Sequence, residues 1–196
     1  MPCGLTTCAW SARCTPCRAA GRSSGSPWGC EGSKARMLQP IHMIFLGNPL
    51  WGDDGAGTYL LRRFSRLRES RGSLSRQGRP VVLIDGGTGG LNLLNAFDGA
   101  GRIEVFDAVQ SGGHPGEVYR IPGRQVEFWP ARSSHDFGIE QVIRLYCEIS
   151  PDPLDLDDIV LYGIEVKGLE FGESLSPPVQ QACDRLFNRL VEELDP

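Results

Sequence analysis

Short apolar runs alternate with segments of mixed polarity along the chain from residue 41 to its end. The apolar runs are bounded by Gly, Pro, Asp or Asn, which is typical of buried strands. In the segments between them apolar residues recur three and four positions apart, which predicts amphipathic helices. The pattern predicts strands over 41–46, 80–84, 102–106, 117–121 and 158–164, and helices over 58–71, 91–97, 137–149 and 177–194.

This alternation predicts the class and architecture of the fold. Strands that are apolar nearly throughout are covered on both faces, and strand–helix alternation favours parallel pairing. We therefore expect an α/β three-layer sandwich, in which a twisted, mostly parallel sheet lies between helices. The segment 117–121 follows a Gly/Pro turn and is the candidate for an antiparallel edge strand, whereas 72–78 reads as a polar linker.

The first 36 residues differ from the rest because they are rich in Cys, Ser, Gly and Arg. This composition is typical of a disordered segment, and it lacks the continuous apolar stretch of a secretory signal. We expect 1–36 to be a disordered tail and 37–196 to form a single α/β domain. A chain that began at Met37 would keep the whole first strand, so we expect it to fold as stably as the full chain.

The chain has seven cysteines, most of them in the tail. A secreted disulfide framework would place paired cysteines throughout the folded part, so we expect the reducing environment of the cytoplasm. The Cys14-x-x-Cys17 pair has no second pair and no histidine in the tail to complete a zinc site. Cys147 and Cys183 fall on predicted helices and are expected to behave as small buried hydrophobic residues.

The formal net charge of −4 argues against two classes of partner. A protein with this charge has no general affinity for nucleic acid or for anionic membrane surfaces. No apolar run approaches the roughly 20 residues needed to span a bilayer. We therefore expect neither nucleic acid nor a membrane as a partner.

The turn after the first predicted strand carries the first candidate chemistry. It reads Gly-Asn-Pro-Leu-Trp-Gly-Asp-Asp-Gly-Ala-Gly over 47–57 and leads into a predicted helix. An Asp at the start of a helix commonly caps the exposed backbone N–H groups. A cap does not need both Asp53 and Asp54 together with several glycines, so this turn is also a candidate functional site.

Asp85, Asp107 and His135 are further candidates, because each follows a predicted strand or opens a predicted helix. In an open parallel sheet the loops at the carboxyl ends of the strands share one edge, where ligands bind. Asp54, Asp107 and His135 would supply two carboxylates and one imidazole, a set that suits a borderline divalent metal with open positions.

Spacing alone leaves simpler roles open for these residues. Asp85 could bond the backbone of the Gly-Gly turn that follows it, and His135 could cap its helix. Glu165, at the end of the last predicted strand, could face the same site or bond the backbone. His42 is expected to pack within its strand, and His114 to be solvated.

Conventional nucleophile and dinucleotide motifs fit poorly. The chain has no Gly-x-Ser-x-Gly sequence, and Ser134 beside His135 does not by itself make a triad. Neither cysteine of the folded part lies in a loop where a thiolate would be activated. Gly-x-Gly-x-x-Gly is absent, and Asp53 and Asp54 would repel a pyrophosphate at that helix start.

Six motifs in a fixed order give the chain a resemblance to a known family. They read Gly47-Asn48-Pro49-Leu50-x-Gly52-Asp53-Asp54-Gly55-x-Gly57, Asp85-Gly86-Gly87-Thr88, Asp107-Ala108-Val109, Ser133-Ser134-His135, Gly163-Ile164-Glu165 and Phe171-Gly172-x-x-Leu175-Ser176-Pro177. Together they resemble the hydrogenase maturation endopeptidases of nickel–iron hydrogenases, from about Ile41 to the C-terminal helix. The resemblance implies an endopeptidase that removes a short C-terminal peptide from the precursor of a hydrogenase large subunit after nickel insertion.

The resemblance also implies roles for single residues. Asp54, Asp107 and His135 stand at the positions that engage nickel in the family, and Asp85 at one that matters for cleavage. Nickel would then come with the substrate, and no tightly bound metal of the enzyme's own is expected. Many relatives have Glu where this chain has Asp54, and Gly where it has Phe45. Asp at that position shortens the reach by one methylene and keeps the charge.

Two other functions remain open at this point. One is a non-proteolytic assembly factor that binds the nickel-loaded precursor and cleaves nothing. The other is a small-molecule hydrolase with its own zinc or manganese, which would be purified with stoichiometric metal. The four residues Asp54, Asp85, Asp107 and His135 favour the peptidase, because a chaperone has no need of all of them.

Overall fold

The computed structural model describes residues 39–126, 132–133, 138–168, 170–172 and 174–196. The predicted tail over 1–36 and the candidate ligand His135 lie outside the described residues. The strands are β1 (Ile41–Leu46), β2 (Ser75–Arg76), β3 (Arg79–Gly87), β4 (Arg102–Gln110), β5 (Val118–Pro122), β6 (Arg132–Ser133) and β7 (Ile159–Glu165). The helices are η2 (Gly52–Gly55), α2 (Ala56–Arg71), α3 (Leu93–Phe97), α4 (Gly123–Val126), α5 (Ile139–Ile149), η3 (Leu156–Asp158) and α6 (Pro177–Glu192).

The strands form one mixed sheet in the order β2-β3-β1-β4-β7-β5, and β6 pairs with the end of β4. The four central strands β3, β1, β4 and β7 are parallel to one another. The short outer strands β2 and β5 are antiparallel to their neighbours. The predicted mostly parallel sheet is confirmed, and so is the antiparallel edge strand near 117–121.

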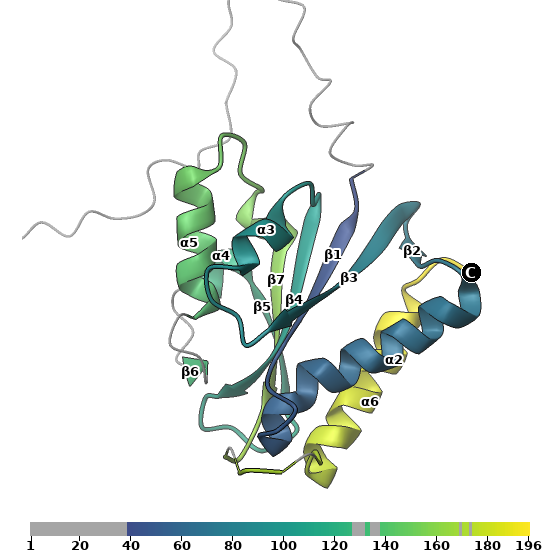
Figure 1. The fold of residues 1–196 in the computed structure, drawn as a ribbon, viewed down its shortest axis with the longest axis vertical. Coiled ribbons are helices and arrows are strands. Elements are labelled where there is room, and N and C mark those ends of the chain that lie inside the picture. Colours follow the sequence, from purple (N-terminus) through teal and green to yellow (C-terminus); the bar gives the residue numbers. More distant parts are fainter. Residues whose placement is uncertain (1–38, 127–131, 134–137, 169, 173) are drawn as a thin grey trace, which may run out of the picture.

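Helices cover both faces of this sheet, as Figure 1 shows. On one face α2 and α6 pack against Ile41, Met43 and Phe45 of β1. On the other face α3 and α5 pack against Ile44 and Leu46 of the same strand. Every residue of β1 is therefore buried, which explains a sequence that is apolar except for His42. The three-layer α/β sandwich expected from the sequence is confirmed.

Stacked aromatic rings connect the central strands on the α2/α6 face. The ring of Phe106 on β4 stacks on Phe45 of β1 at 4.8 Å and on Tyr162 of β7 at 5.0 Å, measured between ring centroids. Phe64 of α2 lies 4.8 Å from Phe187 of α6. Aromatic contacts of this kind stabilise the core beyond simple area burial, so the strand ends that carry the candidate site rest on a layer of packed rings.

The segment 72–78 was predicted as a linker and instead contains β2. Arg76 of β2 is buried, and its guanidinium forms ion pairs with Glu104 of β4 at 2.6 Å and with Glu193 after α6 at 3.0 Å. A buried arginine needs such partners, because an unpaired charge in the interior is costly. Pairing across distant segments is invisible in a local polarity pattern, which is why the sequence suggested a linker.

Within the described ranges no helix has the length and apolar character needed to cross a bilayer.

Candidate active site at the carboxyl end of the sheet

Two glycines let the turn after β1 pack directly on the end of that strand. Gly47 has a φ of +129°, and a Cβ there would lie 1.9 Å from the carbonyl oxygen of Asp54. A Cβ on Gly57, in the first turn of α2, would lie 2.0 Å from the carbonyl oxygen of Leu46. No side chain fits into such spaces. The close packing holds η2, with Asp53 and Asp54, against the carboxyl end of the sheet.

Asp54 is buried, with 3% of its surface exposed, and its Oδ2 accepts a 2.8 Å hydrogen bond from the backbone N–H of Asn48. Gly55, not Asp54, occupies the N-cap position of α2. The helical turn η2 also lies against β4. The Asp54 carboxylate thus holds the backbone of the Gly-Asn-Pro turn at Asn48.

Its neighbour Asp53 has a structural role. Its carboxylate accepts a 2.6 Å hydrogen bond from the backbone N–H of Ser176 and a 2.8 Å bond from the Ser176 hydroxyl. Ser176 occupies the N-cap position of α6 but makes no side-chain cap hydrogen bond to that helix. Asp53 thus ties η2, which also contains Asp54, to the start of α6.

Asp107 lies within β4 and is 1% exposed. The sequence ended this strand at residue 106, but β4 continues to Gln110 because β7 pairs with it as far as Glu165. Asp107 pairs with Gly163 of β7, and because glycine has no side chain, β7 places none beside the Asp107 carboxylate. Asp107 points to the same face as Ile103 and Val105, which is the α3/α5 face.

Asp54 and Asp107 come from touching elements at one edge of the sheet. The third predicted ligand, His135, lies outside the described residues. Ser133 of β6, two positions earlier in the sequence, pairs with Val109, two residues beyond Asp107. Within the described part of the chain, no group of three or more His, Cys, Asp or Glu side chains is arranged to hold a metal ion.

Asp85 lies at the same edge of the sheet but on the other face. It pairs in register with Phe45 and so points to the α2/α6 face. Two strand spacings, roughly 10 Å, separate the backbones of β3 and β4. Asp85 is exposed, and its Oδ1 accepts a 2.9 Å hydrogen bond from the backbone N–H of Gly87. The turn role that the sequence left open for Asp85 is therefore present, and its exposed carboxylate can still meet a substrate.

Glu165 holds the backbone of the loop after β4. Its buried carboxylate accepts hydrogen bonds from the backbone N–H groups of Ser111, Gly112 and Gly113 at 3.0–3.1 Å, and a short one from the Ser111 hydroxyl. Of the two roles left open, backbone bonding is the one observed. Among the histidines, Nδ1 of His42 lies 2.7 Å from the carbonyl oxygen of Ala96, and the side chain of His114 is exposed.

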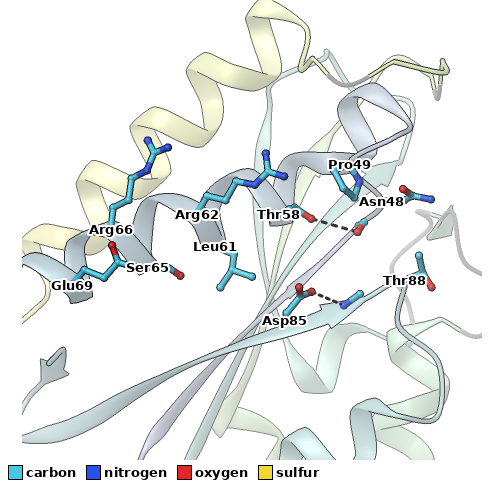
Figure 2. A pocket seen from close by; sticks show the side chains of 12 residues that line it. Asn48, Pro49, Thr58, Leu61, Arg62, Ser65, Arg66, Glu69, Asp85 and Thr88 are labelled. Carbon is cyan, nitrogen blue, oxygen red and sulfur yellow. Dashed lines mark hydrogen bonds between the residues drawn. The ribbon is translucent and has the colours of Figure 1, made fainter. Parts of the chain in front are cut away.

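A groove of about 730 Å³ runs between α2 and the end of β3. Figure 2 shows Asp85 and Thr88 on the strand side of this groove and Leu61 pointing toward the strand from α2. Arg62 and Arg66 also line the groove from α2, and in Figure 2 their side chains extend to the side of the helix away from Asp85. The groove was not predicted from the sequence, because its two walls are distant in the chain. Asp85 and Thr88 belong to a recognised motif, but the wall formed by α2 carries none.

A model of the hydrogenase maturation protease family matches residues 66–193 of this chain. The chain is also 34% identical over 146 residues to the hydrogenase expression/formation protein HupD of Bradyrhizobium diazoefficiens, covering 71% of this chain and 70% of that one. The chain belongs to the hydrogenase maturation protease family.

Solved structures agree with this assignment. The [NiFe] hydrogenase maturation protease HybD from Thermococcus kodakarensis is 26% identical, with a TM-score of 0.58 over 78% of this chain and 97% of that chain. The hydrogenase maturating endopeptidase HybD from E. coli shares the fold, with a TM-score of 0.61 at 21% identity over 78% of this chain and 90% of that one. The predicted family and the predicted enzyme class, a peptidase, are confirmed.

The matched family segment of this maturation protease contains Asp85, Asp107 and His135, whereas Asp54 lies before it. Sequence reasoning missed the link between Asp53 and Ser176. The signal for it was present in the motifs, since an Asp-Asp pair and a Ser-Pro helix start both stood among them. Only the fold brings those two motifs into contact.

Proposed function

We propose that this maturation protease is an endopeptidase that removes a short C-terminal peptide from the nickel-loaded precursor of a nickel–iron hydrogenase large subunit. Nickel in the substrate is the recognition element. The observation that carries the proposal is the pair of buried carboxylates of Asp54 and Asp107, on touching elements at the carboxyl end of the sheet. Ligands bind at this edge in open α/β sheets.

The donor set suits a metal that is borrowed from the substrate. Two carboxylates with the imidazole of His135 make a weak and open site for a divalent ion. In the precursor, nickel is held by cysteine thiolates, which are softer ligands and hold it more firmly. The enzyme then binds a loaded precursor more tightly than an empty one, and it leaves the metal where it was.

Hydrolysis can follow either of two routes. In the first, the substrate's nickel polarises the carbonyl of the scissile bond. In the second, Asp85 takes a proton from the attacking water, and nickel only docks the precursor. The second route agrees with the exposure of Asp85 and with the acceptor capacity left on its carboxylate beyond the bond to Gly87.

The decisive experiment incubates the full chain with nickel-loaded precursor and measures the mass of the precursor's C-terminus. We expect loss of a short peptide from the loaded precursor, and an unchanged mass for precursor prepared without nickel. A stable complex with uncut precursor would instead indicate the non-proteolytic assembly factor.

An Asp85→Asn variant separates the two chemical routes. If Asp85 is the general base, the variant binds nickel-loaded precursor with unchanged affinity but cleaves it at least about 100-fold more slowly, which is the usual contribution of such a base. Binding is measured by co-elution and cleavage by mass. Cleavage at the wild-type rate would remove Asp85 from the mechanism.

A further inference from the structure

The outer edge of β3 is paired only near its start. β2 pairs with Arg79 and Pro80, and the carbonyl oxygen of Leu74 accepts a 2.8 Å hydrogen bond from the backbone N–H of Val81. Beyond Val81, no other segment of the described chain pairs with this side of the strand. An unpaired edge offers a row of N–H and C=O groups to another extended chain.

The backbone groups that face outward follow from the strand period. The N–H of Val81 points away from β1, toward β2. Because a strand repeats every two residues, the backbone groups of Leu83 and Asp85 point the same way. The open edge therefore ends at Asp85, the candidate general base. The backbone N–H and C=O groups of Leu83 and Asp85 are the ones left unpaired along it.

Depressions lie on both faces of this edge. The groove described above lies on the α2 face, and a smaller pocket of about 320 Å³ lies between β3 and α3 on the other. The smaller pocket is lined by Asn92 and Asn95, among others, and Asp85 lines both. A strand added to the edge would send alternate side chains into the two depressions. Main-chain bonding with alternating pockets is the pattern by which sheet edges recognise peptides.

The α2 wall of the groove carries two arginines, Arg62 and Arg66, and one acid, Glu69, at its far end. Arg62 and Arg66 are exposed and lie one helical turn apart on α2. Neither forms an ion pair with a carboxylate of the described chain, whereas Arg63 between them pairs with Asp184 of α6. Two guanidinium groups without an internal partner favour a carboxylate brought by a ligand.

We propose that the C-terminal segment of the precursor binds as an added β-strand on the free edge of β3, with a carboxylate of that segment held by Arg62 and Arg66. This inference rests on the proposed endopeptidase function. The nickel end of the substrate lies at Asp54 and Asp107, so the segment beyond the scissile bond passes Asp85. It then continues toward the start of β3, antiparallel to it.

Simple lengths support this direction. The open edge from Val82 to Asp85 has a length of roughly 13 Å. Helix α2 starts at the same end of the sheet, and Arg62 and Arg66 lie about 9 and 15 Å along it from Ala56. A carboxylate four or five residues beyond the scissile bond is then level with the two arginines. It is either the terminal α-carboxylate or an acidic side chain.

A double charge reversal, Arg62→Glu with Arg66→Glu, tests the role of these two arginines. The matched control is Arg185→Glu with Arg189→Glu on α6, because this pair is also exposed, has the same spacing and gives the same charge change. With nickel-loaded precursor as substrate, we expect KM to rise at least about tenfold for the groove variant with kcat within twofold. The control should keep the wild-type KM. Equal KM values for the two variants overturn the inference. A wild-type protein that leaves the precursor uncut overturns the proposed function as well.

Peptides with the sequence that the wild-type enzyme releases test the added strand itself. Each peptide carries one N-methylated backbone nitrogen and competes with the precursor for cleavage. We expect weaker inhibition from every second position, because only alternate N–H groups face β3. If inhibition weakens at consecutive methylated positions, or at no position, the added strand is overturned. If inhibition falls when the peptide's C-terminus is amidated, the arginines bind the α-carboxylate. If inhibition falls only when an acidic residue is replaced by its amide, the arginines bind that side chain. If neither change weakens inhibition, the carboxylate contact is overturned.

Discussion

Replacing Asp53 tests whether the turn that carries Asp54 is held in place from the other end of the chain. Asp53 is 7% exposed, and its carboxylate accepts both the backbone N–H and the hydroxyl of Ser176. An Asp53→Ala variant leaves both donors without this partner, at the start of α6. In the wild-type protein the Asp53 carboxylate also faces the positive end of the α6 dipole.

The cost can be worked from these two bonds. Hydrogen bonds to a charged group contribute about 1.5–3 kcal/mol each, and the half-buried Ser176 allows water to replace part of that. We expect Asp53→Ala to lower the free energy of unfolding by about 3 kcal/mol. For a chain of this size that corresponds to a fall in Tm of roughly 6–12 °C.

Urea denaturation followed by circular dichroism measures this loss, and a double-mutant cycle assigns it. Ser176→Ala should cost about 1 kcal/mol by itself, since it removes only the hydroxyl bond. The double variant should then be less destabilised than the sum of the two by about 1 kcal/mol. A coupling energy of zero, or a loss below about 0.5 kcal/mol for Asp53→Ala, would refute the tie between η2 and α6.

Three further predictions concern packing, a buried thiol and the N-terminal segment. Gly57→Ala places a Cβ 2.0 Å from the carbonyl oxygen of Leu46 and should lower stability by more than about 3 kcal/mol in the same assay, whereas Gly168→Ala meets open space and should be neutral. Burial raises the pKa of the Cys183 thiol from 9.0 to about 12, so this thiol stays protonated in the folded protein. Stability should therefore be fully present below pH 9 and fall between pH 9 and about 12, and peptide mass analysis should find Cys183 unlabelled by a thiol reagent until the protein unfolds. A chain beginning at Met37 should melt at the temperature of the full chain, and a clearly lower Tm would contradict the prediction that residues 1–36 contribute nothing to the core.

How far the sequence predicts the site differs from residue to residue. The motifs marked Asp54, Asp85 and Asp107 because each follows an apolar run, and parallel strands end at a common edge. They did not show that Asp85 points to one face of the sheet and Asp107 to the other. That difference depends on the register with β1 and on the extension of β4 to Gln110. Register is set by the neighbouring strands and is not written in the strand itself.

The pattern of the chain alone determined the central strands, the longer helices and their layers, because a strand that is buried on both faces is apolar at nearly every position. It did not predict the short strand β2. The identity of β1 and α2, and even the direction of the edge strand β5, could be predicted from local sequence. Tertiary structure alone decided which polar residues meet. The bond between Asp53 and Ser176, the buried pairing of Arg76, and the groove beside β3 each join segments that are distant in the chain. Contacts of this kind depend on how the elements pack in space, and a local pattern of polarity does not contain that information.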